Sequence, residues 1–142
     1  MSKTLYLMVG PAGAGKSTWA KNHSATCGDS YKIVTLSVGT DGFYSYISNL
    51  NQALYENSVV YADASHLTEH SRNRVLNNLE LMNVDIIPVV IYPSVETCLA
   101  QNAKRSGHCR LSDWNIKRIY SKMRPPTHEE KYRYAAIVTV KE

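Results

Sequence analysis

Five short apolar runs recur along the chain, and the segments between them place apolar residues three or four positions apart. The runs cover residues 5–9, 31–36, 59–62, 86–92 and 135–140. Several are almost continuously apolar, which is typical of parallel strands covered by helices on both faces. Parallel strands need crossover connections, and the helical segments supply them. The pattern predicts a three-layer α/β/α sandwich around a five-stranded, mainly parallel sheet.

Helical segments are marked by apolar faces and by capping residues. Two segments each place four apolar residues on one helical face: Phe43, Ile47, Leu50 and Leu54 in the first, and Val75, Leu76, Leu79 and Met82 in the second. Three residues can cap helices that begin just after them: Thr68, Ser94 and Ser112. The helix after Ser112 has to end before Pro125. An extra helical insertion is therefore expected between the fourth and fifth strands.

Composition narrows the class of protein. The 142 residues show no repeat or linker, so we expect one domain over residues 1–142. No apolar run is long enough to cross a bilayer and no signal peptide is evident, so we expect a soluble cytoplasmic protein without membrane contact. Three cysteines without a C-x-x-C pair indicate reduced thiols. The net charge of +4 favours polyanionic partners.

The stretch "GPAGAGKST" behind the first apolar run carries the clearest chemistry. Gly10, Gly15, Lys16 and Ser17 satisfy G-x-x-x-x-G-K-[ST] between a predicted strand and a predicted helix. Such a loop wraps its N–H groups around a phosphate, the lysine reaches the β- and γ-phosphates, and the serine binds Mg²⁺. The predicted nucleotide-binding residues are Gly10, Gly13, Ala14, Gly15, Lys16, Ser17 and Thr18. Because the Asn-Lys-x-Asp guanine signature is absent, we expect ATP. The loop alone does not choose among a kinase, a motor and a switch.

Two carboxylates follow predicted strands, at the sheet edge where ligands of open α/β sheets bind. Asp41 follows the second strand and could act as a general base, although capping the next helix with Thr40 explains it equally well. Asp63 directly follows the third strand and is a candidate Mg²⁺ ligand with Ser17, or a strand-end turn residue. His66 and His70 are four residues apart, but the predicted cap at Thr68 separates them.

A basic region follows the fourth strand. Nine lysines and arginines lie between residues 93 and 133. An inserted arginine stabilises the charge of a transferring phosphoryl group, and Arg105 is the leading candidate, with Arg110 next. The basic residues further along are explained as a solvated helix face: Lys117, Arg118, Lys122 and Arg124.

Together these stretches resemble a known family. "LYLMVGPAGAGKSTWA", "VVYADASHLT", "QNAKRSG" and "IKRIYSKMR" look like the kinase domain of bacteriophage polynucleotide 5′-hydroxyl kinases over nearly the whole chain. The resemblance implies a P-loop kinase with a small helical lid over about residues 101–112, a phage source, and transfer of the γ-phosphate of ATP to a 5′-hydroxyl of DNA or RNA. It also implies that Lys16 and Ser17 hold phosphates and Mg²⁺, that Asp41 is the base, that Asp63 lies near the metal and the acceptor, and that Arg105 is the lid arginine.

The chain departs from the family pattern on the acceptor side. Tyr44 and Gln101 stand where family members commonly have arginines, and "SVGTDG" is longer and richer in glycine. Two alternatives therefore stay open: a kinase for a small acceptor such as a nucleoside, a sugar or a modified base, and a nucleotide-dependent switch without transfer activity. The choice between DNA and RNA is open, and the sequence is compatible with a homo-oligomer.

Overall fold

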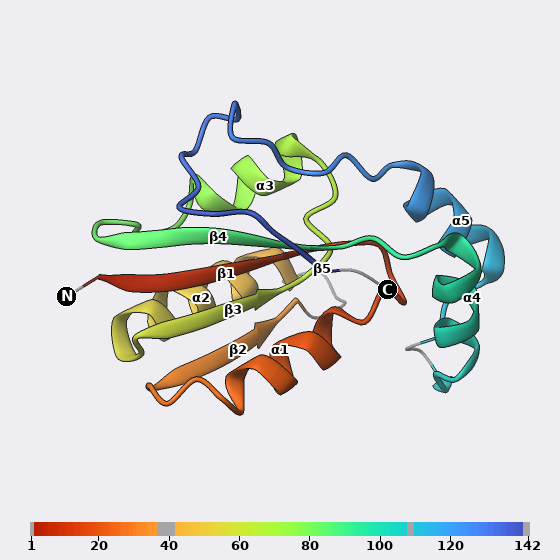
Figure 1. Ribbon diagram of the computed structural model, residues 1–142, viewed down its shortest axis with the longest axis horizontal. Helices are drawn as coiled ribbons and strands as arrows, with labels where there is room; N and C mark the ends of the chain where they lie inside the picture. The colour runs from red at the N-terminus through yellow and green to blue at the C-terminus, as the bar shows by residue number, and fades with distance from the viewer. Residues whose placement is uncertain (1, 37–41, 108–109, 141–142) are drawn as a thin grey trace.

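The computed structural model describes residues 2–36, 42–107 and 110–140 and contains a five-stranded sheet (Figure 1). β1 (Lys3–Val9) lies in the middle, between β3 (Val59–Asp63) and β4 (Val84–Ile91), and β2 (Tyr31–Thr35) and β5 (Val138–Val140) are the edges. Every pairing is parallel, in the order β2-β3-β1-β4-β5. The predicted α/β fold is confirmed, and the sheet is wholly parallel.

Helices cover both faces of this sheet and give the three predicted layers (Figure 1). α1 (Lys16–Ser24), α4 (Val95–Ala103) and α5 (Asp113–Ser121) contribute to the core on one face. α2 (Gly42–Glu56) and α3 (Glu69–Leu76) contribute to the core on the other. α4 and α5 form the predicted insertion and lie together beyond the carboxyl ends of the central strands.

The core beneath α2 follows from its helical periodicity. Leu50 and Leu54 are almost fully buried against Leu5 and Leu7 of β1, as their shared face predicts. Burial of each such side chain stabilises the fold by about 1.5–3 kcal/mol. Tyr46 is equally buried, at 2% exposure, although the predicted face did not include it. The Tyr46 hydroxyl is hydrogen-bonded to His66 in the β3–α3 loop, which allows this polar group to be buried.

The three predicted helix caps are confirmed. Thr68 accepts a hydrogen bond from the Ser71 N–H at the start of α3, and the Ser71 hydroxyl completes a capping box. Ser94 and Ser112 accept hydrogen bonds from the N–H groups of Thr97 and Asn115 at the starts of α4 and α5. Each cap satisfies an N–H group that the first helical turn leaves without a partner, and contributes about 1 kcal/mol.

The predicted helical face through Met82 is wrong. α3 ends at Leu76, and Met82 is 88% exposed. The chain then reaches Asn83 with a positive φ of 60°, a conformation that asparagine tolerates, and turns directly into β4.

The last strand is also shorter than predicted, since β5 begins at Val138. No helix in the part of the chain described by the structure is long and apolar enough to cross a membrane.

One buried ion pair fastens α3 to the segment that leads into β5. Arg72, only 1% exposed, binds both carboxylate oxygens of Glu130, with N···O distances of 3.1 and 2.8 Å. Tyr134 and the Thr127 N–H also donate to Glu130. Burial alone would raise the pKa of Glu130, but these hydrogen bonds and the Arg72 charge outweigh it and hold the pKa below its ordinary value.

Replacing Glu130 with glutamine tests this pair. Glu130→Gln should lower the free energy of unfolding by about 3 kcal/mol near neutral pH, because it leaves the Arg72 guanidinium buried without a counter-charge. Urea denaturation measures the change, and Glu129→Gln on the exposed neighbour is the control. Because the pKa of Glu130 in the folded protein is below its ordinary value of 4.5, ionised Glu130 stabilises the fold at pH values above 4.5. This contribution is lost as the pH falls through the pKa of the folded state. The difference between parent and variant should therefore shrink in acid, and a constant difference would contradict a charge-based role.

Candidate functional site

The loop of residues 10–15, called here the glycine loop, joins β1 to α1 and packs tightly against neighbouring backbone. A Cβ on Gly10 would lie 2.3 Å from the Ile91 carbonyl oxygen, and one on Gly13 would lie 2.6 Å from that of Cys98. Gly13 and Gly15 also have positive φ values of 82° and 101°. Close packing therefore requires glycine at position 10, the positive φ favours it at position 15, and both reasons apply to Gly13. The loop therefore holds one shape against β4 and α4.

The start of α1 is open to an anion. Gly15 is the N-cap of α1 and provides no side-chain hydrogen bond, unlike the capping residues of α3, α4 and α5. The N–H groups of the first turn and the positive end of the helix dipole therefore have no capping side chain opposite them. This is the arrangement that binds phosphate at helix N-termini.

Lys16 folds back over the glycine loop. Its Nζ donates to the carbonyl oxygens of Gly10 and Pro11, at 3.0 and 2.9 Å. Burial lowers the pKa of the Lys16 ammonium to about 8; the Asp63 carboxylate opposes this shift and the Arg105 charge adds to it. Among the described residues Lys16 forms no ion pair, and its hydrogen-bond partners are two backbone carbonyl groups.

Ser17 and Asp63 meet at the end of β3. The Ser17 hydroxyl donates to Oδ2 of Asp63 at 2.6 Å, and Thr35 at the end of β2 donates to the same oxygen at 3.3 Å. Asp63 is 5% exposed. The predicted pair is thus in direct contact. No group of three or more His, Cys, Asp or Glu suited to a metal occurs within residues 2–36, 42–107 and 110–140.

The β3–α3 loop is fastened to the glycine loop by hydrogen bonds that sequence reasoning missed. The Gly10 N–H donates to the Ser65 carbonyl, and Nδ1 of His66 donates to the Met8 carbonyl at 2.6 Å. Nε2 of His66 then accepts from the Tyr46 hydroxyl at 3.0 Å, which makes the imidazole neutral. Burial lowers the pKa of His66 to about 4, in agreement. No spacing in the sequence signals this role.

His66 also adopts an unusual backbone conformation, with φ at 45°. This conformation is costly for a residue other than glycine, and it persists only where the surroundings fix it. The Arg72 guanidinium supplies one such contact by donating to the His66 carbonyl at 2.8 Å. His70, in contrast, is exposed at the start of α3 on the far side of the Thr68 cap. The two histidines therefore do not form a metal site.

The loop between α4 and α5, within the predicted lid, has its two ends tied together. The fully buried Asn102 donates to the Leu111 carbonyl at 2.7 Å and accepts from the Leu111 N–H at 3.0 Å. Arg105 lies three residues after Asn102 and is exposed, yet its charge contributes to lowering the pKa of Lys16. Lys16, Ser17, Asp63 and Arg105 are thus brought to one end of the sheet, while Asp41 lies outside the described residues.

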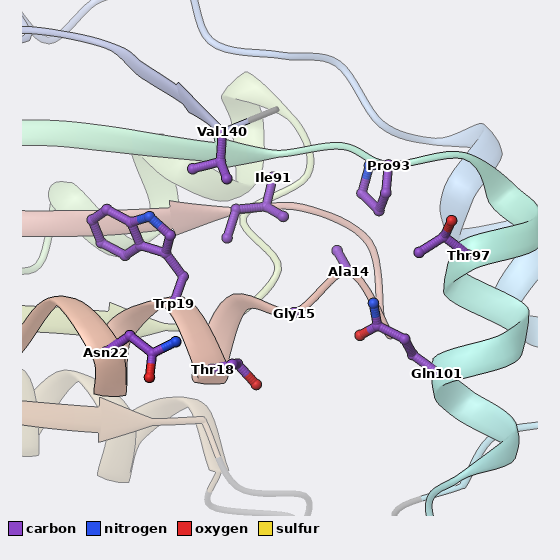
Figure 2. Close-up of a pocket in the computed structure, with 10 residues that line it drawn as sticks. All are labelled: Ala14, Gly15, Thr18, Trp19, Asn22, Ile91, Pro93, Thr97, Gln101 and Val140. Atoms are coloured by element: carbon purple, nitrogen blue, oxygen red, sulfur yellow. The ribbon is translucent and has the colours of Figure 1, made fainter. Parts of the chain in front are cut away.

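A cavity of about 530 Å³, called here the first cavity, opens beside the glycine loop between α1 and α4 (Figure 2). Its lining includes Gly15, Trp19 and Asn22 on one side and Pro93, Thr97 and Gln101 on the other. In Figure 2 the Gln101 side chain extends from α4 toward Gly15. The mixture of apolar walls and a few polar groups is typical of small-molecule sites.

A second cavity of about 360 Å³ lies where the chain leaves β2 and β3. Its lining includes six residues from five parts of the chain: Leu36, Phe43, Tyr46, His66, Arg74 and Lys122. The Arg74 guanidinium lies over the Phe43 ring, 3.8 Å from the centroid, and so presents a cation beside an aromatic wall. This second cavity belongs to the α2 and α3 layer, whereas the first cavity belongs to the α1 and α4 layer.

Comparison with known proteins identifies the fold. No protein-family model matches the chain, and no curated protein sequence matches it. Solved structures do. A fungal RNA kinase matches with a TM-score of 0.78 and 13% identity over 99% of this chain, and a gluconokinase from Sinorhizobium meliloti with 0.60 and 14% over 98%. A deoxyadenosine kinase from M. mycoides with bound dATP matches with 0.58 and 18% over 84%.

These likenesses show that the chain has the P-loop kinase fold. The chain spans 38% of the length of the fungal RNA kinase, and 81% of that of the gluconokinase and of the deoxyadenosine kinase. Of the predicted resemblance, the P-loop kinase fold is confirmed, without a specific family.

Gly13→Ala tests whether the glycine loop needs its close packing. This variant should weaken ATP binding at least tenfold, because the new methyl group meets the Cys98 carbonyl and shifts the loop that would hold the phosphates. Gly28→Ala is the matched control, since Gly28 also has a positive φ, of 74°, but no neighbouring atom lies within 4 Å of the position that a Cβ would occupy there. It should cost about 1–2 kcal/mol of stability and leave ATP affinity unchanged. Equal ATP affinities of the two variants in isothermal titration calorimetry would contradict this role.

The lowered pKa of Lys16 predicts a pH dependence of nucleotide binding. A phosphate interacts with the ammonium form, which predominates below a pKa of about 8. The dissociation constant for ATP should therefore change little just below this pH, where ATP itself keeps its full charge, and should rise by up to tenfold per pH unit above it. Lys16→Met should bind ATP more weakly and without this dependence. A parent protein whose affinity does not change across this range would show that Lys16 does not contact the phosphates.

Proposed function

We propose that the chain is an ATP-dependent kinase that transfers the γ-phosphate to the 5′-hydroxyl of a polynucleotide. The observation that carries this proposal is the convergence of Lys16, the Ser17–Asp63 pair and Arg105 at one end of the sheet, with a cavity in each helical layer beside them. Two cavities at one phosphate site suit a reaction with two substrates.

On the donor side, the triphosphate would lie in the glycine loop and at the start of α1, and the nucleoside in the first cavity. Asn22, Thr97 and Gln101 offer this cavity the polar groups that orient a base or a ribose. Lys16 would exchange its two carbonyl partners for phosphate oxygens. Because the lysine already lies over the loop, little side-chain ordering remains to be done on binding.

The Ser17–Asp63 pair fits Mg²⁺. Both partners offer oxygen atoms, and Mg²⁺ takes few protein ligands because it keeps waters and binds substrate phosphates. When bound, Mg²⁺ would neutralise charge on the β- and γ-phosphate oxygens.

The transfer itself depends mainly on positioning. The 5′-hydroxyl oxygen forms a bond to the γ-phosphorus, the bond from that phosphorus to the bridging oxygen breaks, and ADP leaves. The hydroxyl proton passes to the Asp41 carboxylate, which acts as general base. Lys16 and Arg105 offset the negative charge that develops. The second cavity, adjoining the end of β3, would hold the terminal nucleoside of the acceptor, with Phe43 as an aromatic wall.

The likeness to an RNA kinase supports a polynucleotide acceptor, whereas the likeness to a gluconokinase and a deoxyadenosine kinase favours a second candidate, a small hydroxyl compound. The second cavity has a size suited to either acceptor, since a terminal nucleoside differs from a free nucleoside only in being joined to a further nucleotide. The difference lies outside the cavity, on the surface that a longer chain would cross.

Phosphate transfer from γ-labelled ATP separates these candidates. With Mg²⁺ and a panel of 5′-hydroxyl DNA and RNA oligonucleotides, nucleosides and sugars, label should appear on the oligonucleotides. Asp41→Asn should lower the turnover number by a factor of about 10² to 10⁴ with little change in the Michaelis constant for ATP. Asp85→Asn, an exposed position early in β4, is the matched control and should behave as the parent.

Two results would contradict the proposal. Label on nucleosides or sugars alone would favour the small-acceptor kinase. ATP turnover that is the same in Asp41→Asn and the parent with every acceptor would favour a nucleotide-dependent switch.

A further inference from the structure

The positive charge of the chain is concentrated in one stretch. Residues 101–124 contain seven of the 16 lysines and arginines but one of the 12 acidic residues, which leaves nine basic and eleven acidic residues elsewhere. All seven basic side chains are exposed. The net charge of +4 therefore comes entirely from the end of α4, the following loop and α5. A stretch of this kind attracts a polyanion.

α5 divides this stretch into two faces. Ile116 is fully buried, and Ile119 and Tyr120 follow it on the inner face. The outer face is formed by residues spaced three, four and seven positions apart: Trp114, Lys117, Arg118 and Ser121. All four are exposed, so this outer face has no partner within the described chain.

Trp114 is the unusual member of the outer face. It is 69% exposed, and the Arg118 guanidinium lies 5.3 Å from the centroid of its ring. A flat aromatic surface flanked by cations combines base stacking with phosphate contact, which is how proteins bind single-stranded nucleic acid. An acidic peptide would pair with the cations but would leave the indole without a flat π-face to stack on.

We infer that the outer face of α5 binds the single strand of a polynucleotide acceptor behind its 5′ end, an inference that rests on the proposed function. Trp114 stacks on a base, and Lys117 and Arg118 contact phosphates. Lys122, which caps the carboxyl end of α5, lines the second cavity, so the outer face leads away from the place proposed for the acceptor hydroxyl. From Lys122 to Trp114 the helix spans roughly 12 Å, the length of about three to four stacked nucleotides.

The first test compares a short with a longer acceptor. In the double variant Lys117→Gln/Arg118→Gln, the Michaelis constant for a 5′-hydroxyl octanucleotide should rise about tenfold, while the constants for a 5′-hydroxyl dinucleotide and for ATP should stay unchanged. The log–log salt slope of octanucleotide binding should become shallower by about 1.4, because each of the two cations removed accounts for about 0.7. The control Lys32→Gln/Arg133→Gln removes the same two charges from exposed positions elsewhere, at the start of β2 and before β5, and should behave as the parent.

The second test uses the two tryptophans of the chain. Trp19 lines the first cavity, so its fluorescence should report ATP, whereas that of Trp114 should report the oligonucleotide. Oligonucleotide titration without ATP should quench the parent but not Trp114→Ala, whose octanucleotide affinity, measured by fluorescence anisotropy of a labelled strand, should be lower by about tenfold or more. Trp114→Phe should retain most of that affinity, because a phenyl ring still stacks.

The outcomes separate this inference from the proposed function. Suppose that the parent transfers label to oligonucleotides but that both double variants keep the parent's Michaelis constant for the octanucleotide and its salt slope. The inference is then wrong and the proposed function stands. If no oligonucleotide is labelled, the proposed function is wrong, and the ATP-free titration still decides the inference: binding weakened by Lys117→Gln/Arg118→Gln supports it. No binding to the parent would overturn it.

Discussion

The close approach of the glycine loop to neighbouring backbone is the constraint on which the rest of the site depends. Gly10 packs against the end of β4 and Gly13 against α4, with no room for a side chain at either position. The loop, the strand and the helix therefore keep a fixed relation to one another. α4 leads into the loop that carries Arg105. The packing of Gly13 against α4 therefore also determines where Arg105 lies relative to Lys16.

The fold buries two positive charges, those of Arg72 and Lys16, with different kinds of partner. Arg72 has a carboxylate partner in a bidentate pair, which makes it part of the framework that holds the β3–α3 loop. Within the described part of the chain, the direct partners of Lys16 are carbonyl oxygens, and its lowered pKa reflects the burial that these dipoles do not offset. A phosphate would supply the missing counter-charge, so the cost of burying Lys16 favours ligand binding.

Sequence patterns predicted what depends on local rules. The apolar runs predicted the strands, Thr68, Ser94 and Ser112 predicted the helix starts, and the glycine spacing placed Lys16 and Ser17 at a helix N-terminus. Apart from the Ser17–Asp63 pair, the contacts between distant segments were not predicted. His66 joining Met8 to Tyr46, and Asn102 joining both ends of a loop, use single polar residues whose partners only the fold brings together. The prediction for Met82 was wrong because its apolar spacing continued past Leu76, where α3 ends.

The Asn102 contact with Leu111 has a consequence for how this fold diversifies. Because the buried Asn102 side chain bonds both the carbonyl and the N–H of Leu111, it holds the two ends of the α4–α5 connection together. Loop-closure entropy grows only slowly with length, so a connection closed in this way tolerates insertions. The connection between α4 and α5 is thus a place where this fold can accept a change of length while both helices stay in position.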